Sequence, residues 1–239
     1  MKTGIFFAAK PEAAAVLSCG FFGWKKDGNG FYKSEKTDTL LCISGVGKDK
    51  AIPAAELLAQ NCDKIFILGT CAALTPQLPV FTFCLPTLVL SDTVDDSFVP
   101  DNELTARLAD VLHNLNIDYK TDLKLVSTNN LIATKEQAES LHYKTDAVIG
   151  DMESVAIMQT LAKTKTPVAI LRAVSDNPAA GVLPLDTNSG TFANKWIENT
   201  AEISKHFPAI VKLLVSRFFT GNKLPPAETS LSKQVIGIF

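Results

Sequence analysis

The chain has 239 residues, of which 46% are hydrophobic and 20% charged, a composition typical of one ordinary globular α/β domain. Its formal net charge of −2 gives no electrostatic basis for binding nucleic acid or an anionic membrane surface. No apolar run reaches the ~18–20 residues of a transmembrane helix.

Apolar, strand-like runs alternate along the chain with amphipathic stretches. The first run is broken at Lys10, Pro11 and Glu12, which argues against a signal peptide and for a cytoplasmic protein. Strand-like runs are predicted at residues 4–9, 39–47, 64–73, 81–94, 122–130, 147–151 and 168–176. Helices are predicted at residues 11–19, 48–60, 101–116, 134–146, 152–164 and 192–218.

This alternation predicts an α/β fold with a central mixed, mostly parallel sheet that helices cover on both faces. Because no linker is evident, we assign residues 1–219 to a single domain. Residues 220–239 are turn-rich and polar and end in the apolar sequence VIGIF. We expect this segment to be a C-terminal extension whose tip docks on the body or on another subunit.

Cysteine and histidine spacing gives no sign of a disulfide framework or a metal site. The five cysteines are widely spaced among apolar neighbours, and the three histidines stand alone. We therefore expect buried free thiols, no metal and no cofactor. The cysteines are Cys19, Cys42, Cys62, Cys71 and Cys84, and the histidines are His113, His142 and His206.

Four segments in chain order resemble the nucleoside phosphorylase and nucleosidase family, particularly the methylthioadenosine/S-adenosylhomocysteine nucleosidases. They are MKTGIFFAAKPEAAAVL, SGVGKDKA followed by ILGTCAAL, VIGDMESVA and LRAVSD. The sequences DMES and LVSTNNLIATKEQ also resemble branches that accept bulky 5′ substituents, which include futalosine hydrolase and the hopanoid-associated nucleosidases. The resemblance implies a nucleoside phosphorylase-like domain, a purine nucleoside pocket and, usually, a homodimer.

Glu12 has two interpretations. The resemblance implies that it is the base that activates water, a role that suits a partly desolvated carboxylate. Alternatively, it is a first-turn helix residue behind Pro11, favoured there by the helix dipole. The turn SGVG is similar to a family loop near the 5′ end of the sugar, which implies contact by Val46; a tight turn without ligand contact is the alternative.

The segment GTCAAL is similar to a family loop near the sugar, in which Thr70 would supply a hydroxyl. It departs from the family pattern because Ala72 and Ala73 replace two glycines. Their methyl groups would obstruct close backbone approach to a ligand and penalise positive φ angles. The local geometry here is therefore expected to differ from that of the family.

In DMES, the resemblance implies that Glu153 accepts hydrogen bonds from both ribose hydroxyls, which suits the two oxygens of a carboxylate. Met152 would pack against the sugar face, as its adaptable side chain permits. The alternative is an acid at a helix N-terminus beside a core methionine. Asp151 is interpreted as a cap or supporting residue rather than a ligand.

Asp176 ends the predicted strand 168–176, where sheets of this class place ligand residues. The resemblance implies that it shares a proton with N7 of the purine, and burial would raise its pKa enough for it to donate near neutral pH. Ser175 and Arg172 are expected to support this acid. The alternative interpretation is a turn-initiating aspartate before Asn177.

Only three arginines are present, Arg107, Arg172 and Arg217, and none lies where phosphorylases of this family clamp phosphate. Lys10 and Lys64 offer charge without a bidentate fork. We therefore predict a nucleosidase that hydrolyses the N-glycosidic bond of an adenosine-type nucleoside bearing a 5′ substituent. A phosphate-dependent phosphorylase and a catalytically weak nucleoside-binding protein are the alternatives.

The identity of the 5′ substituent stays open, and so does the packing on the base. Leu131 stands where small-substrate nucleosidases carry a phenylalanine that packs on the base. Phe192 and Phe98 are candidate replacements for that aromatic.

Overall fold

A computed structural model describes residues 1–28, 30–93, 95–185 and 194–216 of the protein. The strands are β1 (Thr3–Phe7), β2 (Trp24–Lys26), β3 (Phe31–Ser34), β4 (Thr39–Ile43), β5 (Lys64–Ala73), β6 (Phe83–Ser91), β7 (Ser97–Phe98), β8 (Tyr119–Ser127), β9 (Ile149–Asp151) and β10 (Val168–Asp176). The helices are α1 (Lys10–Ser18), α2 (Lys48–Asn61), α3 (Asn102–Asn114), α4 (Lys135–Thr145), α5 (Ser154–Thr164), the 3₁₀-helix η1 (Pro178–Ala180), α6 (Asn194–Ser204) and α7 (Phe207–Val215).

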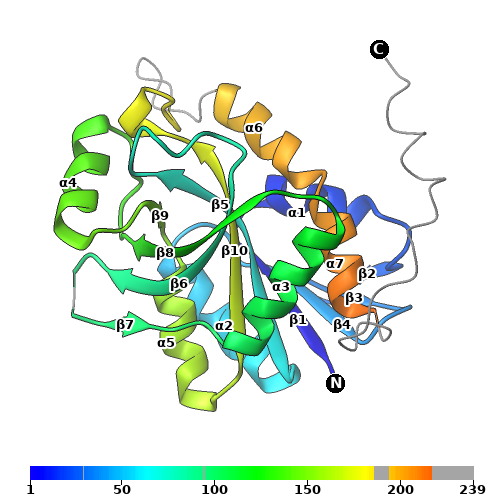
Figure 1. Cartoon of the computed structure of the whole chain (residues 1–239). Coiled ribbons are helices and arrows are strands. Elements are labelled where there is room, and N and C mark those ends of the chain that lie inside the picture. Colours follow the sequence, from blue (N-terminus) through cyan, green and yellow to red (C-terminus); the bar gives the residue numbers. More distant parts are fainter. Residues whose placement is uncertain (29, 94, 186–193, 217–239) are drawn as a thin grey trace, which may run out of the picture.

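One mixed sheet organises the domain, with strand order β10-β6-β8-β9-β5-β1-β4-β3-β2 (Figure 1). Its long ladders, β5–β10, β6–β8, β1–β4 and β1–β5, are parallel. Antiparallel pairing joins β2, β3 and β4 at one edge and joins β9 to β5. Because β10 pairs with both β5 and β6, five strands close into a ring. The prediction of a mixed, mostly parallel sheet is confirmed.

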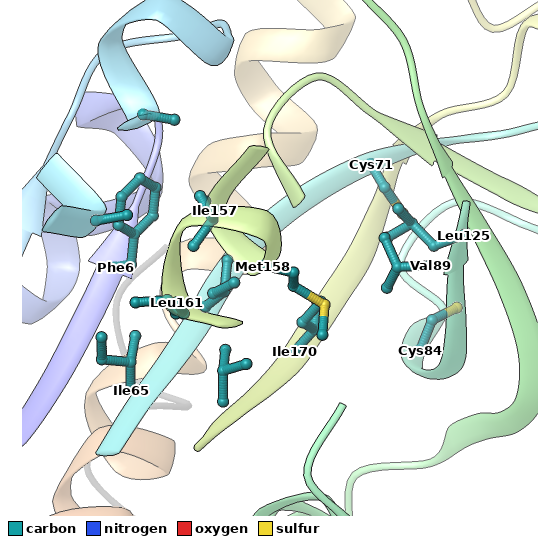
Figure 2. Packing of buried hydrophobic residues seen from close by; sticks show 14 of the residues in the cluster. Phe6, Ile65, Cys71, Cys84, Val89, Leu125, Ile157, Met158, Leu161 and Ile170 are labelled. Carbon is teal, nitrogen blue, oxygen red and sulfur yellow. The ribbon is translucent and has the colours of Figure 1, made fainter. Parts of the chain in front are cut away.

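Side chains on the central strands alternate between two apolar layers, as the twofold period of a strand requires. On β1, Phe6 enters one layer while Ile5 and Phe7 enter the other. Helices α2 and α5 cover the first layer, whose packing Figure 2 shows. Helices α1, α3, α6 and α7 cover the second (Figure 1). Both faces of the sheet are thus buried, as predicted.

The strands predicted at 64–73 and 168–176 coincide with β5 and β10. Strands β2, β3 and β7 were not predicted, since each is short and lies among polar or turn-forming residues. The single helix predicted at 192–218 is wrong within the described residues, which contain two helices there. Pro208 explains the break, because its ring would clash with the carbonyl of Ser204 in a continuous helix.

All five cysteines are free thiols; four are buried, as expected, and Cys19 is partly exposed. Among the described residues, no helix is both long and apolar enough to cross a membrane. The extension predicted at 220–239 lies outside the described residues, so the domain boundary at 219 stays a prediction.

Candidate active site

One cavity brings together all eight site residues that the sequence predicts. It opens at the carboxyl ends of β5, β9 and β10, beside the start of α1. The eight predicted residues on its wall are Glu12, Val46, Thr70, Leu131, Met152, Glu153, Ser175 and Asp176. The sequence did not single out Ala9, Cys71, Ile132, Gly150 or Trp196, which also line it.

Glu12 lies in the first turn of α1, as its structural interpretation expects, and it also lines the cavity; its role as the base stays a prediction. Its Oε2 accepts from the backbone N–H of Ala9 at 2.8 Å. Its Oε1 accepts from the backbone N–H of Thr70 at 2.7 Å and from the Thr70 hydroxyl at 2.8 Å. These three donors hold the buried carboxylate against the end of β5, at the cavity wall.

Gly69 lies behind this carboxylate and was not among the predicted site residues. A Cβ atom at residue 69 would lie 2.6 Å from Nη1 of Arg172 and 2.8 Å from Oε1 of Glu12. Any side chain would therefore push these two charged groups away. The glycine of GTCAAL is required for this close packing, independently of any ligand.

Arg172 is fully buried and pairs with Asp151, not with Asp176. Its Nη2 lies 2.5 Å from Oδ2 of Asp151, and its Nε donates to the same oxygen at 3.0 Å. The expectation that Arg172 supports Asp176 is therefore wrong. Arg172 donates to Asp151 at the end of β9, whereas Asp176 lies four residues further along β10.

Asp151 anchors a buried polar network, which agrees with its interpretation as a cap and support. Its Oδ1 accepts from the Ser127 hydroxyl at 2.5 Å and from the backbone N–H of Ser154 at 3.2 Å. The Ser154 hydroxyl donates to Oδ2 at 2.5 Å. The Asp151–Arg172 pair thereby fixes the start of α5, where Glu153 is the N-cap residue.

Glu153 faces the cavity from this fixed position. Its Oε1 accepts from the backbone N–H of Gly47 at 2.7 Å, in the predicted SGVG turn. Burial, and after it the nearby charge of Asp151, raise the pKa of Glu153 to about 7 against the opposing effects of Arg172 and the Gly47 N–H. The carboxyl group is thus poised to change protonation state near neutral pH.

Asp176 is buried at the end of β10, and its Oδ1 accepts from the Ser175 hydroxyl at 2.6 Å. Burial raises the pKa of Asp176 to about 7, although the Ser175 hydrogen bond lowers it. Ser175 thus contacts the acid that it was expected to support. A carboxyl with this pKa can carry a transferable proton at neutral pH.

The two alanines of GTCAAL adopt ordinary strand geometry. Ala72 pairs with Gly150 on β9 and with Asp176 on β10, while Ala73 is buried in the layer beneath α5. Neither has a positive φ. The predicted conformational penalty is therefore absent, because both alanines lie within the strand predicted at 64–73.

The apolar wall of the cavity carries Val46, Leu131 and Met152, the residues that were predicted to contact the substrate. Trp196, on the first turns of α6, is the one aromatic residue among the described lining residues. Phe98 packs instead against the buried layer beneath α5, and Phe192 lies outside the described residues. No signal in the sequence pointed to Trp196; in the structure it lies three residues before the buried Asn199.

The amino-acid sequence matches a known protein family and is similar to two nucleosidases. The sequence profile of the Phosphorylase superfamily matches residues 22–209. The chain is 27% identical to 5′-methylthioadenosine/S-adenosylhomocysteine nucleosidase of Staphylococcus carnosus, over 61% of this chain and 72% of that protein. It is 23% identical to aminodeoxyfutalosine nucleosidase of Campylobacter jejuni, over 74% of this chain and 81% of that one.

Among solved structures, the fold is similar to that of 5′-methylthioadenosine/S-adenosylhomocysteine nucleosidase from Helicobacter pylori. The TM-score is 0.75 at 18% identity, and the match covers 90% of this chain and 97% of the other. At this identity the likeness describes the fold.

Proposed function

This chain belongs to the phosphorylase superfamily, and from that premise we propose that it is a purine nucleosidase. The proposed reaction hydrolyses the N-glycosidic bond of an adenosine-type nucleoside with a 5′ substituent and releases the base. One observation carries the proposal: Glu12, Glu153 and Asp176 are buried acids on the wall of a single cavity. The similarity to two nucleosidases supports it.

Each acid has a distinct proposed role. Asp176 donates a proton to N7 of the purine, so that the base leaves with the electron pair of the glycosidic bond. Glu153 accepts hydrogen bonds from the ribose hydroxyls while the sugar gains oxocarbenium character. Glu12 takes a proton from the water that forms the new bond to C1′.

The hydrogen-bond capacity of Glu12 supports the water-activating role. An ionised carboxylate offers about four acceptor sites, and Ala9 and Thr70 donate three hydrogen bonds to Glu12. Oε1 accepts two of these hydrogen bonds and Oε2 accepts one, so the remaining acceptor site, on Oε2, is left for a water.

The charges around the cavity support hydrolysis over phosphorolysis. Neither lysine nor arginine lines the cavity within the described part of the chain. Lys64 begins β5, at the end of the strand opposite Thr70, and lines a different hollow. Arg172 is 1% exposed and committed to Asp151. A phosphate ion would therefore find no bidentate partner here.

The test is incubation of the protein with adenosine, 5′-methylthioadenosine, S-adenosylhomocysteine and bulkier 5′-substituted analogues, with and without phosphate. We expect free base and free sugar at equal rates in both conditions. Strict dependence on phosphate with release of the sugar 1-phosphate would assign a phosphorylase instead. Nucleoside binding without base release would assign a binding protein.

A cytoplasmic location and a homodimer are also proposed. Two exposed apolar side chains support the dimer: Val46, in the turn before α2, and Leu57, on α2, are each 41% accessible. Light scattering on the full-length protein at micromolar concentration should give twice the chain mass. A monomer mass would remove the dimer and leave the nucleosidase proposal unaffected.

A further inference from the structure

Purine recognition in proteins commonly uses an aromatic surface, because every base has a π-face on which a ring can stack. In the described part of the cavity wall, that surface is Trp196, while Leu131 and Ile132 are aliphatic. We propose that the Trp196 indole contacts the planar base of the substrate and is a specificity-determining residue. This inference rests on the proposed function, because it takes a purine as the ligand.

Helix α6 is fixed relative to the proposed acid. The buried Asn199 donates from Nδ2 to the backbone carbonyl of Ser175 at 2.7 Å. Trp196 lies three residues before Asn199, so the two side chains share a helix face. Ser175 in turn donates to Asp176. Trp196 and Asp176 thus line the same cavity from two linked elements, and we expect a base that reaches Asp176 to lie beside the indole.

The chemistry of the proposed reaction makes this contact stronger as the reaction proceeds. Once the base takes up proton character from Asp176, it becomes electron-poor, and an indole face is the best aromatic partner for a cationic ring. The contact thus stabilises the leaving base more than the neutral bound nucleoside. Phenylalanine at position 196 should retain part of this effect, and alanine should retain none.

Tryptophan fluorescence tests the placement directly, because the chain has only two tryptophans. Trp24 stacks on Phe22 at 4.9 Å between ring centroids, and its Nε1 donates to the carbonyl of Val16, away from the cavity. Adenine should quench the emission of the wild type and of Trp24→Phe. It should leave the emission of Trp196→Phe unchanged, since only Trp24 then reports.

The energetic test compares Trp196→Ala with Ile197→Ala, a change at the next residue of α6, which is 46% exposed. Affinity for adenine and for an unreactive adenosine analogue should each fall about tenfold in Trp196→Ala (~1.4 kcal/mol). Neither should change in Ile197→Ala. Equal loss for both ligands assigns the contact to the base.

Several outcomes would overturn the inference: no adenine quench in the wild type, a quench that persists in Trp196→Phe, or unchanged adenine affinity in Trp196→Ala. A loss confined to 5′-substituted nucleosides would also overturn it, because Trp196 would then contact the substituent. These titrations require no turnover. If Trp196-dependent adenine binding is found without hydrolysis, the hydrolase proposal fails while this inference stands.

Discussion

The carboxylate of Glu153 accepts a 2.7 Å hydrogen bond from the backbone N–H of Gly47, a residue 106 positions earlier in the chain. This contact ties the turn before α2 to the start of α5, and it orients Glu153 before any ligand arrives. One carboxylate oxygen is partly used, and the remaining acceptor sites are available for a vicinal diol. The side of the cavity that is proposed to bind the sugar is therefore organised by the protein itself.

Replacing Glu153 by glutamine should impair turnover through ribose recognition. The amide oxygen of Gln can still accept from Gly47, which leaves an NH₂ donor where the ribose hydroxyls need an acceptor. We expect a loss of ~2–4 kcal/mol in transition-state stabilisation, measured from kcat/KM. The loss should be smaller on a 2′-deoxyribose substrate; comparable losses on the two sugars would count against this role.

Asp176→Asn should keep the shape of the site and remove the transferable proton. Because general acid catalysis contributes ~10²–10⁴-fold, the single-turnover cleavage rate should fall by at least that order. Affinity for an unreactive analogue should change far less, since an amide still hydrogen-bonds to N7. A nitrophenyl riboside, whose leaving group needs no proton, should lose much less rate. Equal losses on both substrates would mean that Asp176 only positions the base.

The raised pKa of Asp176 also predicts a pH dependence of stability. Its carboxyl titrates near 3.8 when exposed and near 7 in the fold. Between these pH values, the folded state holds a proton on Asp176 that the unfolded chain has lost. This proton stabilises the fold fully below about pH 4, and the stabilisation is lost as pH rises through 7. Between pH 5 and pH 8, this group should lower the free energy of unfolding by about 2–3 kcal/mol.

Urea unfolding at both pH values measures this effect, with Asp176→Asn as the control. The wild type should lose more stability than the variant over this interval, because the asparagine has no proton to lose. Burial also raises the pKa of Glu153, but that group is present in both proteins and largely cancels in the comparison. Identical pH profiles would mean that Asp176 does not titrate in this range.

Gly69→Ala should damage both stability and activity. The new methyl group would lie within 3 Å of Glu12 and Arg172, a distance that real Cβ atoms essentially never adopt. Overpacking of this kind costs about 1–3 kcal/mol, and it should also displace Glu12. Gly20→Ala is the matched control, because no atom lies within 4 Å of its added Cβ. Thermal unfolding and kcat/KM of both variants check this; a Gly69→Ala protein with normal activity would contradict the packing argument.

The Arg172–Asp151 pair should contribute far more to stability than a surface pair. Arg172→Met leaves Asp151 buried without its cation, which should reduce the free energy of unfolding by about 3–5 kcal/mol. Lys205→Met breaks the exposed ion pair with Glu202 on α6, and it should change the free energy of unfolding by less than about 1 kcal/mol. Chemical denaturation of both variants makes the comparison, and similar small effects would show that Asp151 is not held by this charge.

The local pattern of apolar residues in the sequence determined much of the architecture. Central strands such as β5 and β10 are continuous apolar runs because both faces of the sheet are buried, so their limits could be predicted from the sequence. Short edge strands escaped prediction, since β2 and β3 carry mixed polarity and acquire strand geometry only by pairing with each other and with β4. Pro208 was visible in the sequence, but the apolar periodicity on either side of it concealed the break.

The predicted site residues could be named because each lies in or just after a strand in a recognisable segment. Their partners could not, because a hydrogen bond across the fold depends on which strands become neighbours. Asp151 rather than Asp176 receives Arg172, and Gly69 is required by the side chains of Glu12 and Arg172 rather than by a turn. Trp196 reaches the cavity from α6, which Asn199 links to the end of β10. The periodicity of apolar residues predicts which side chains of one segment are buried. The contacts described here join different segments, which become neighbours only when the sheet closes.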